Sequence, residues 1–199
     1  MAAIPASITD ALIATGHRMD RHGWVPATAG NLSHRLPGGH IAITRSGVHK
    51  GRLIAADILT VNAQGRTVDL ERHPSAETLL HCQIYTQFPT AQAVLHGHSI
   101  AGTVLSRHVD RLAVTGYELL KAFGIATHDT TLELPILDND QDMPRLAAVL
   151  APILPGARMG YLIRGHGTTI WGDTIDAAFN RLEAVEFLLE CELAVRTLR

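Results

Sequence analysis

The sequence contains little cysteine and few aromatic residues. Its 199 residues include only Cys82 and Cys191, one in each half of the chain. Two isolated cysteines do not make a disulfide framework, so we expect two free thiols in a reducing compartment. The aromatic residues, two Trp, three Tyr and four Phe, are scattered along the chain. This scatter argues against a platform on which nucleic-acid bases would stack.

Long apolar runs and an excess of charge are also missing. No apolar run reaches the length of a transmembrane helix, and residues 1–24 lack the basic and apolar regions of a signal peptide. The 17 basic and 19 acidic residues give a formal net charge of −2, without a Lys/Arg block. We therefore expect a cytoplasmic protein that binds neither membrane nor nucleic acid. A small anionic substrate stays possible, because it needs only a few donors.

The composition is that of a packed globular chain. Hydrophobic residues make up 46% of the sequence and charged residues 18%, which excludes a disordered chain. A chain of this length suits a single domain with a substantial core, and we predict one domain over residues 1–199.

The hydrophobic pattern alternates between strand and helix periodicity. Helical spacing is found in several segments, and strand-like alternation in others. The predicted helices cover 7–22, a segment capped by Ser75, the residues after Ser99, the segment 116–124, a segment starting at Asp142, and 173–199. The predicted strands are 40–44, a hairpin over 56–70, 91–99, 125–137, and a strand–turn–strand unit over 158–172. The segment 24–39 reads as a break, because it contains Pro26, Gly30 and Pro37. We expect one mixed sheet with helices on both faces.

The stretch "VLHGHS" places two histidines at the end of an apolar strand. Because side chains i and i+2 of a strand point to the same side, His96 and His98 face one side together. Gly97 between them carries no side chain that would crowd the opposite face. The pair either decorates a surface or shares a metal ion, and an H-x-H pattern alone does not decide between the two.

A third histidine lies in a similar position. His166 stands between Gly165 and Gly167 in "LIRGHGTTIWG", after another apolar strand. The two glycines predict an unusual backbone conformation that aims one side chain, although a solvated turn histidine is the alternative. Three imidazoles with an open fourth position are the pattern of catalytic zinc. Mn, Fe and Co remain alternatives to Zn²⁺ for such ligands.

Five motifs, in order and spacing, resemble the class II aldolase/adducin family over almost the whole chain. They are "ATAGNLSHRL", "ITRSGVHKG", "PSAETLLH", "AVLHGHS" and "GHGTTIWG". The resemblance implies a three-layer α/β/α fold with a mixed, largely antiparallel sheet. It further implies one Zn²⁺ per subunit, bound by His96, His98 and His166, and a homotetramer.

Four further stretches resemble one branch of that family. They are "RHGWVPATAGNLS", "GYELLKAFG", "NDQDMPRLA" and "LEAVEFLLECELA". This branch implies zinc-dependent dehydration of 5-methylthioribulose 1-phosphate to 2,3-diketo-5-methylthiopentyl 1-phosphate, in methionine salvage. The sequence does not identify the residues that would contact the methylthio group.

The resemblance also implies a phosphate pocket formed by "TAGNLS", "TRSG" and the serine of "PSAE". Its residues would be Gly30, Asn31, Thr44, Ser46, Gly47, Lys50 and Ser75. Backbone N–H groups beside glycines and a serine at a helix N-terminus suit an anion, and Lys50 and Arg45 would add positive charge. Taken singly, each glycine–polar cluster is also compatible with an ordinary turn.

Two glutamates compete for the acid/base role. Glu118 follows the metal-binding strand by about twenty residues, where the dehydratase branch has its acid/base. Its apolar and aromatic neighbours suggest partial burial and a raised pKa. Glu77 of "PSAE" lies where class II aldolases have a glutamate that takes part in proton transfer. We rank Glu118 first and Glu77 second.

Three other functions remain in competition with dehydration. A class II aldolase or 4-epimerase acting on another ketose phosphate would use the same enolate chemistry, although the C-terminal "ECELAVRTLR" lacks the tyrosine on which such enzymes rely. An adducin-like, metal-free binding module would have lost ligand histidines. A purely structural zinc site would need a fourth ligand, for which the candidates are Cys82, His73, His81 and His128.

Overall fold

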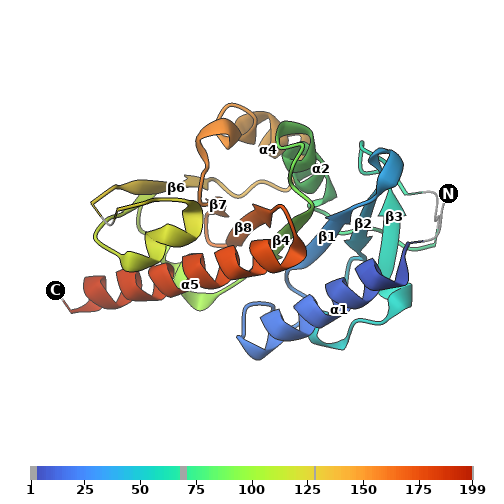
Figure 1. Cartoon of the computed structure of the whole chain (residues 1–199), viewed down its shortest axis with the longest axis horizontal. Helices are drawn as coiled ribbons and strands as arrows, with labels where there is room; N and C mark the ends of the chain where they lie inside the picture. The colour runs from blue at the N-terminus through green and yellow to red at the C-terminus, as the bar shows by residue number, and fades with distance from the viewer. Residues whose placement is uncertain (1–3, 68–70, 128, 199) are drawn as a thin grey trace.

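The computed structural model describes residues 4–67, 71–127 and 129–198. These residues form an eight-stranded sheet in the order β3-β2-β1-β4-β8-β7-β6-β5 (Figure 1). The strands are β1 (Asn31–Arg35), β2 (Ile41–Thr44), β3 (Ile58–Val61), β4 (Ala93–Gly97), β5 (Arg111–Val114), β6 (Leu132–Leu137), β7 (Tyr161–Ile163) and β8 (Gly167–Gly172). Neighbouring strands are antiparallel, except β6 and β7, which are parallel. The predicted mixed, largely antiparallel sheet is confirmed.

Helices cover both faces of the sheet. They are α1 (Ala6–Arg21), α2 (Thr78–Gln87), α3 (Ile100–Leu105), α4 (Met143–Leu150) and α5 (Ile175–Thr197), with the 3-10 helix η4 (Glu118–Phe123) beside α5. In Figure 1, α2 and α4 lie on one side of the sheet, and α1 and α5 on the other. This arrangement confirms the α/β/α fold. None of the helices in the described part of the chain is long and apolar enough to cross a membrane.

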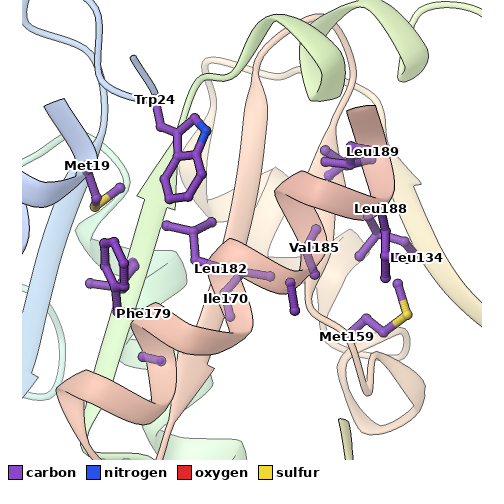
Figure 2. Close-up of a cluster of buried hydrophobic side chains, with 14 of the residues drawn as sticks. Met19, Trp24, Leu134, Met159, Ile170, Phe179, Leu182, Val185, Leu188 and Leu189 are labelled. Carbon is purple, nitrogen blue, oxygen red and sulfur yellow. The ribbon is translucent and has the colours of Figure 1, made fainter. Parts of the chain in front are cut away.

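Successive side chains of the central strands point to opposite faces of the sheet, and this divides the core into two layers. Leu95 of β4 and Ile170 of β8 pack with apolar residues of α1, α3 and α5. Figure 2 shows part of this cluster, including Ile170 and Leu182 of α5. Their neighbours in sequence, Val94 and Trp171, pack with residues of α2 and α4 on the opposite face. His96 has the same parity as Val94, so its ring points to the α2 face of the sheet.

Two strands lie where the sequence did not predict them. The strand β1 falls in the segment that reads as a break, because it contains one large apolar residue, Leu32, while its polar residues Asn31 and Ser33 are buried. Hydrophobic periodicity does not detect a strand whose buried positions are polar. The other is β5, a short edge strand in which buried and exposed residues alternate. Of the far strand of the predicted hairpin, the described residues contain one isolated antiparallel bridge, between Val61 and Thr67. Residues 68–70 lie outside the described ones.

The predicted start of the second helix was wrong by two residues. Helix α2 begins at Thr78 with Glu77 as its N-cap, and Ser75 lies just before it. The carbonyl of Ser75 accepts a hydrogen bond from the Thr78 amide, and the Thr78 hydroxyl donates to the same carbonyl. These two bonds hold the chain in position before the helix through the Ser75 carbonyl. The Ser75 side chain does not cap the helix.

The start of β8 approaches β4 so closely that only glycine fits there. A Cβ added at Gly167 would lie 2.2 Å from the carbonyl oxygen of Gly97 and 3.0 Å from the Cε1 atom of His96. The first of these neighbours is backbone and cannot rotate away. Glycine is therefore required at this point of contact between the two strands.

We expect Gly167→Ala to lower the free energy of unfolding by about 1–3 kcal/mol, because the added methyl group overpacks the β4–β8 contact. Urea unfolding of the chain without added metal measures this loss. Gly156→Ala is the matched control, since a Cβ at Gly156 meets no atom within 4 Å, and its effect should stay within about 0.5 kcal/mol. Equal losses in the two variants would contradict the steric explanation.

Candidate active site

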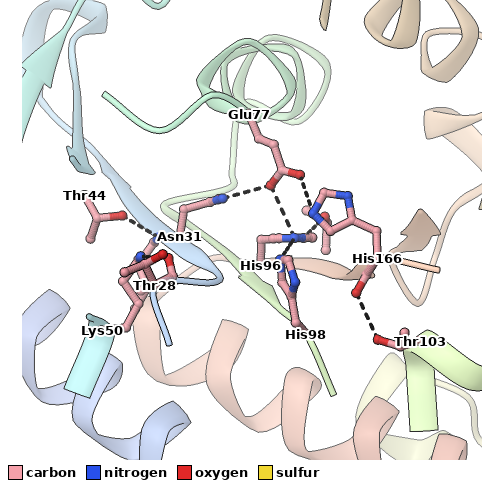
Figure 3. A network of polar contacts seen from close by, with 11 residues as sticks. Thr28, Asn31, Thr44, Lys50, Glu77, His96, His98, Thr103 and His166 are labelled. Atoms are coloured by element: carbon pink, nitrogen blue, oxygen red, sulfur yellow. Dashed lines mark hydrogen bonds and ion pairs between the residues drawn. The ribbon is translucent and has the colours of Figure 1, made fainter. Parts of the chain in front are cut away.

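Three histidine rings converge beyond the end of β4 (Figure 3). His96 Nε2 lies 2.9 Å from His98 Nε2, and one ligand nitrogen from each of His96, His98 and His166 lies within 4.8 Å of the others. The prediction that the H-x-H pair faces one side, with His166 joining it, is confirmed. No other group of three or more such side chains with the geometry to hold a metal occurs in the described residues.

The surroundings keep the two strand histidines neutral. Burial lowers the pKa of His96 well below its usual range, and the neighbouring His166 lowers it further. Burial, together with His96 and His166, lowers the pKa of His98 to about 3. Neutral imidazole is the form that binds metals, and nitrogen lone pairs gathered this closely repel one another without a cation between them. The donor set therefore fits a metal ion.

Neighbouring side chains fix the orientation of these rings. His96 Nδ1 lies 3.0 Å from the Thr169 hydroxyl of β8, which leaves Nε2 facing the other histidines. The Thr103 hydroxyl of α3 donates to the His166 carbonyl at 3.0 Å. Gly165 takes the left-handed conformation (φ 62°) that the sequence suggested, whereas Gly167 is needed for close packing.

Glu77 is the carboxylate of this centre. Its oxygens lie 3.3 Å from His96 Nε2 and 3.2 Å from His166 Nε2. The side-chain amide of Asn31 donates to Glu77 Oε2 at 2.8 Å and holds it in place. Glu77 is only 6% exposed. A buried carboxylate aimed at the metal-facing nitrogens is placed to exchange protons with a substrate held there.

Glu118 does not join this centre within the chain, and its predicted partial burial was wrong. Its side chain is 73% exposed and pairs with Lys121 one turn along η4. The apolar neighbours that suggested burial, Leu120 and Phe123, face inward on the other side of the short helix. Hydrophobic neighbours in sequence do not report which side of a helix a residue occupies.

A pocket of about 170 Å³ adjoins the histidines. It is lined by Thr28, Ala29, Gly30, Asn31, Arg45, Ser46, Gly47, Lys50, Ser75, Ala76, Glu77, His98, Gln141, Met143 and His166. Six of the seven residues predicted for phosphate binding are among them. Thr44 is not, because its buried hydroxyl accepts a hydrogen bond from the Leu32 amide instead.

Two of the backbone amides expected to bind an anion are already occupied. Ser46 N donates to the His73 carbonyl, and Ser75 N donates to the Thr44 carbonyl. The amides of Gly30 and Gly47 and the two serine hydroxyls stay among the donors of the pocket lining. The pocket therefore combines side-chain hydroxyls with fewer backbone amides than the sequence suggested.

Lys50 brings positive charge to the pocket. Its ammonium group donates to the carbonyls of Thr28 and Val48, each at 2.7 Å, and so ties together the two loops that line the pocket. Burial lowers the pKa of Lys50 to about 8, while Asp57 acts in the opposite direction. The group is still mainly protonated at pH 7. Arg45 also lines the pocket, and it pairs with Asp57 at 2.7 Å.

The candidates for a fourth ligand lie elsewhere or outside the described residues. His81 is buried with Nδ1 2.7 Å from the Ser33 hydroxyl, and the Cys82 thiol faces the Asn62 carbonyl. His73 is exposed and does not belong to the cluster. His128 lies outside the residues that the structure describes.

Sequence reasoning missed several residues of the site. Thr169 was not singled out, although it lies in the motif "GHGTTIWG" and pairs with His96 across the sheet. Gln141 and Met143 reach the pocket from the loop before α4 and from its first turn. Only the strand register and the course of the chain place these residues beside the histidines.

Comparison with known proteins gives consistent results. The chain is 58% identical over 188 residues to a methylthioribulose-1-phosphate dehydratase of Gluconacetobacter diazotrophicus, covering 93% of this chain and 92% of that protein. It is 47% identical to one of Pseudomonas paraeruginosa, covering 96% of each. Among solved structures, L-fuculose-1-phosphate aldolase of Thermus thermophilus matches with a TM-score of 0.80 and 27% identity, covering 97% of this chain and 96% of that one.

The family comparison covers nearly the whole chain. The model of the class II aldolase and adducin N-terminal domain matches residues 10–193, a span that includes the three histidines, Glu77 and every residue that lines the pocket. This chain belongs to the class II aldolase and adducin family.

Proposed function

We propose that this chain dehydrates 5-methylthioribulose 1-phosphate to 2,3-diketo-5-methylthiopentyl 1-phosphate in methionine salvage. The observation that carries the proposal is the 58% identity to a methylthioribulose-1-phosphate dehydratase over 93% of the chain. The site geometry agrees with it, because a metal-binding cluster and a buried carboxylate adjoin a pocket that contains a buried lysine. These are the parts needed to enolise a ketose phosphate.

We infer that one Zn²⁺ per subunit is held by His96, His98 and His166. Three neutral imidazoles that leave a position open are typical of catalytic zinc, whereas a structural site takes four protein ligands. A bound zinc ion would supply Lewis-acid polarisation of the substrate's C2 carbonyl. Thr169 keeps His96 turned toward that position.

Glu77 is the proposed acid/base group. Its carboxylate removes the proton from C3, and the electrons of that C–H bond form the C2–C3 double bond of an enolate. The C4–O bond then breaks as the enolate electrons form a C3–C4 double bond, and the hydroxyl leaves as water with the proton that Glu77 returns. Tautomerisation of the remaining enol gives the 2,3-diketone. Asn31 holds one carboxylate oxygen of Glu77 throughout, so the proton is exchanged at a fixed point.

The phosphate group fixes the register of the substrate and is not changed. We propose that it binds in the pocket at Gly30, Asn31, Ser46, Gly47 and Ser75. Lys50 supplies the balancing charge, and its two carbonyl contacts hold the loops in place. Binding energy gained at the phosphate holds C3 next to Glu77. This fixed position raises the rate of proton transfer.

An aldolase or 4-epimerase acting on another ketose phosphate is the second candidate. The aldolase of Thermus thermophilus shares the fold with this chain at 27% identity. Enolate chemistry serves both reactions, since an aldolase breaks a C–C bond where a dehydratase breaks a C–O bond. The higher identity to the dehydratases favours dehydration.

We further propose that the chain forms a homotetramer through the face between η4 and α5. This face contains an apolar hollow of about 810 Å³ lined in part by Tyr117, Leu119 and Phe187. Phe187 is 54% exposed, as expected of a residue that another subunit covers. Glu118 lines the same hollow. Its proposed acid/base role therefore requires that it serve the metal centre of a neighbouring subunit.

Two general predictions remain to be tested. One domain over residues 1–199 and a cytoplasmic location stay predictions. Both cysteines are free thiols in the structure. No role for a nucleic acid or membrane enters the proposal.

Product analysis tests the proposed reaction. Zinc-loaded chain incubated with methylthioribulose 1-phosphate should give a product lighter by one water, detected by mass spectrometry. Glu77→Gln should lower kcat by about 10²–10⁴-fold, because the amide cannot accept the C3 proton. Cleavage into two smaller carbonyl compounds would instead identify an aldolase, and an unchanged substrate would contradict the assignment.

Metal analysis tests the centre independently of turnover. The purified chain should carry about one zinc ion per chain, and His98→Ala should lose most of it because the site then keeps two imidazoles. Elemental analysis after dialysis gives the ratio. His49→Ala is a control histidine outside the cluster. Equal zinc content in His98→Ala and the unaltered chain would exclude this site.

Subunit mixing tests the proposed role of Glu118. Glu77→Gln and Glu118→Gln chains should each have low activity, and activity should return when the two are mixed and allowed to exchange subunits. The mixture contains sites with Glu77 from one chain and Glu118 from another. Full activity of Glu118→Gln alone would remove Glu118 from the reaction, and failure of the mixture to recover would place both groups in one subunit.

A further inference from the structure

A buried carboxylic acid with no part in the proposed reaction lies behind the metal centre. Glu186 is in the middle of α5 and is 0% exposed, among the apolar residues by which this helix packs on the sheet. Glutamate is almost never fully buried without a cationic partner, and no salt bridge to Glu186 occurs within the described residues. Its presence on the inner face of α5 needs a reason other than packing.

The groups around Glu186 belong to the segments that carry the histidines. Burial raises the pKa of Glu186 to about 7, hydrogen bonding by the hydroxyls of Ser99 and Thr168 lowers it, and Glu190 raises it. The hydroxyls lie on the side that faces the helix, because α5 packs against α3 and β8, yet neither carboxyl oxygen makes a hydrogen bond of normal geometry with a described residue. The same is true of the Thr168 hydroxyl. Near neutral pH the carboxyl thus retains unused hydrogen-bonding capacity in a place closed to solvent.

Ser99 and Thr168 lie at the two points where the metal-binding segments meet. Ser99 follows His98 directly and caps α3, its hydroxyl accepting from the Gly102 amide at 3.0 Å. Thr168 follows the glycine after His166 and pairs with Gly97 across the β4–β8 ladder. A Cβ at Gly102 would lie 3.0 Å from the Thr168 hydroxyl and 3.1 Å from that of Ser99, so the two hydroxyls are close together.

We propose that Glu186 is a positioning residue, whose carboxyl sets the spacing between the Ser99 and Thr168 segments and thereby between His98 and His166. The inference rests on the metal centre of the proposed function. Stability alone does not explain the residue, because an apolar side chain of similar size usually stabilises a buried site as well as an unpaired carboxyl or better. Side chains that hydrogen-bond metal ligands are typically worth 10–100-fold in metal affinity, and we expect an effect of this order for a group that spaces the ligand-bearing segments.

The experiment separates metal affinity from stability. Glu186→Leu should unfold, in the presence of a chelator, at a urea concentration at least equal to that of the unaltered chain. It should nevertheless bind Co²⁺ about 10–100-fold more weakly and show altered visible absorption of the bound ion, which reports ligand geometry. Glu186→Gln, which keeps the shape and the hydrogen-bonding capacity, should restore affinity to within about threefold of the unaltered chain.

A second α5 variant serves as the opposite control. Leu189→Ala removes a buried side chain one turn further along α5, so it should lose stability and keep both the Co²⁺ affinity and the spectrum. Where Glu186→Leu does not fold, Thr168→Val removes the facing hydroxyl with little change in shape and should weaken Co²⁺ binding in the same direction.

Each outcome has a defined meaning. Unchanged Co²⁺ affinity and spectrum in Glu186→Leu, or in Thr168→Val where the former does not fold, would overturn the positioning role and leave the metal centre intact. An unaltered chain that binds no Co²⁺ would overturn the metal centre and this inference together. Weak binding by Glu186→Leu that Glu186→Gln fails to restore would trace the loss to the negative charge of the carboxylate, because Gln keeps its shape, and would overturn positioning by hydrogen bonding.

Discussion

The pairing of β4 with β8 is the contact on which the site depends. It places Thr169 opposite His96 and Thr168 opposite Gly97, and it brings the turn that carries His166 to the end of β4. The pairing is tight because Gly167 lets the two backbones approach without a side chain between them. A shift of one residue in this register would turn His96 to the other face of the sheet, away from α2 and Glu77.

Electrostatics then determine what the centre can hold. Burial and mutual proximity lower the pKa of His96 and of His98, so their rings present lone pairs instead of protons. The carboxylate of Glu77, steered by Asn31, faces the same nitrogens. A cation between these groups satisfies the lone pairs and the negative charge together. Burial makes unpaired polar groups costly in free energy. A metal ion would pair with them, so the site is preorganised for a metal.

In the proposed function, the neighbouring pocket orients the substrate. Lys50 ties the loop at Thr28 to the loop at Val48, so its charge and the shape of the pocket are fixed by one side chain. Because the histidine cluster and the proposed phosphate pocket would suit any enolisable ketose phosphate, one scaffold can serve several reactions. We propose that the choice among them is made by the residues that reach the departing group, which for this chain would be Glu77 and, across a subunit contact, Glu118.

The sequence by itself determined the local features: the apolar strands, the long C-terminal helix, the parity that turns His96 and His98 to one side, and the family to which the motifs belong. These follow from near neighbours in the chain and from periods of two and 3.6 residues. Tertiary structure alone decided that β1 is a strand with buried polar residues, that Thr44 is turned away from the pocket, and that Glu77 lies at the centre while Glu118 is exposed. The reason is physical: burial and contact are set by elements distant in sequence, and apolar neighbours along the chain do not reveal them.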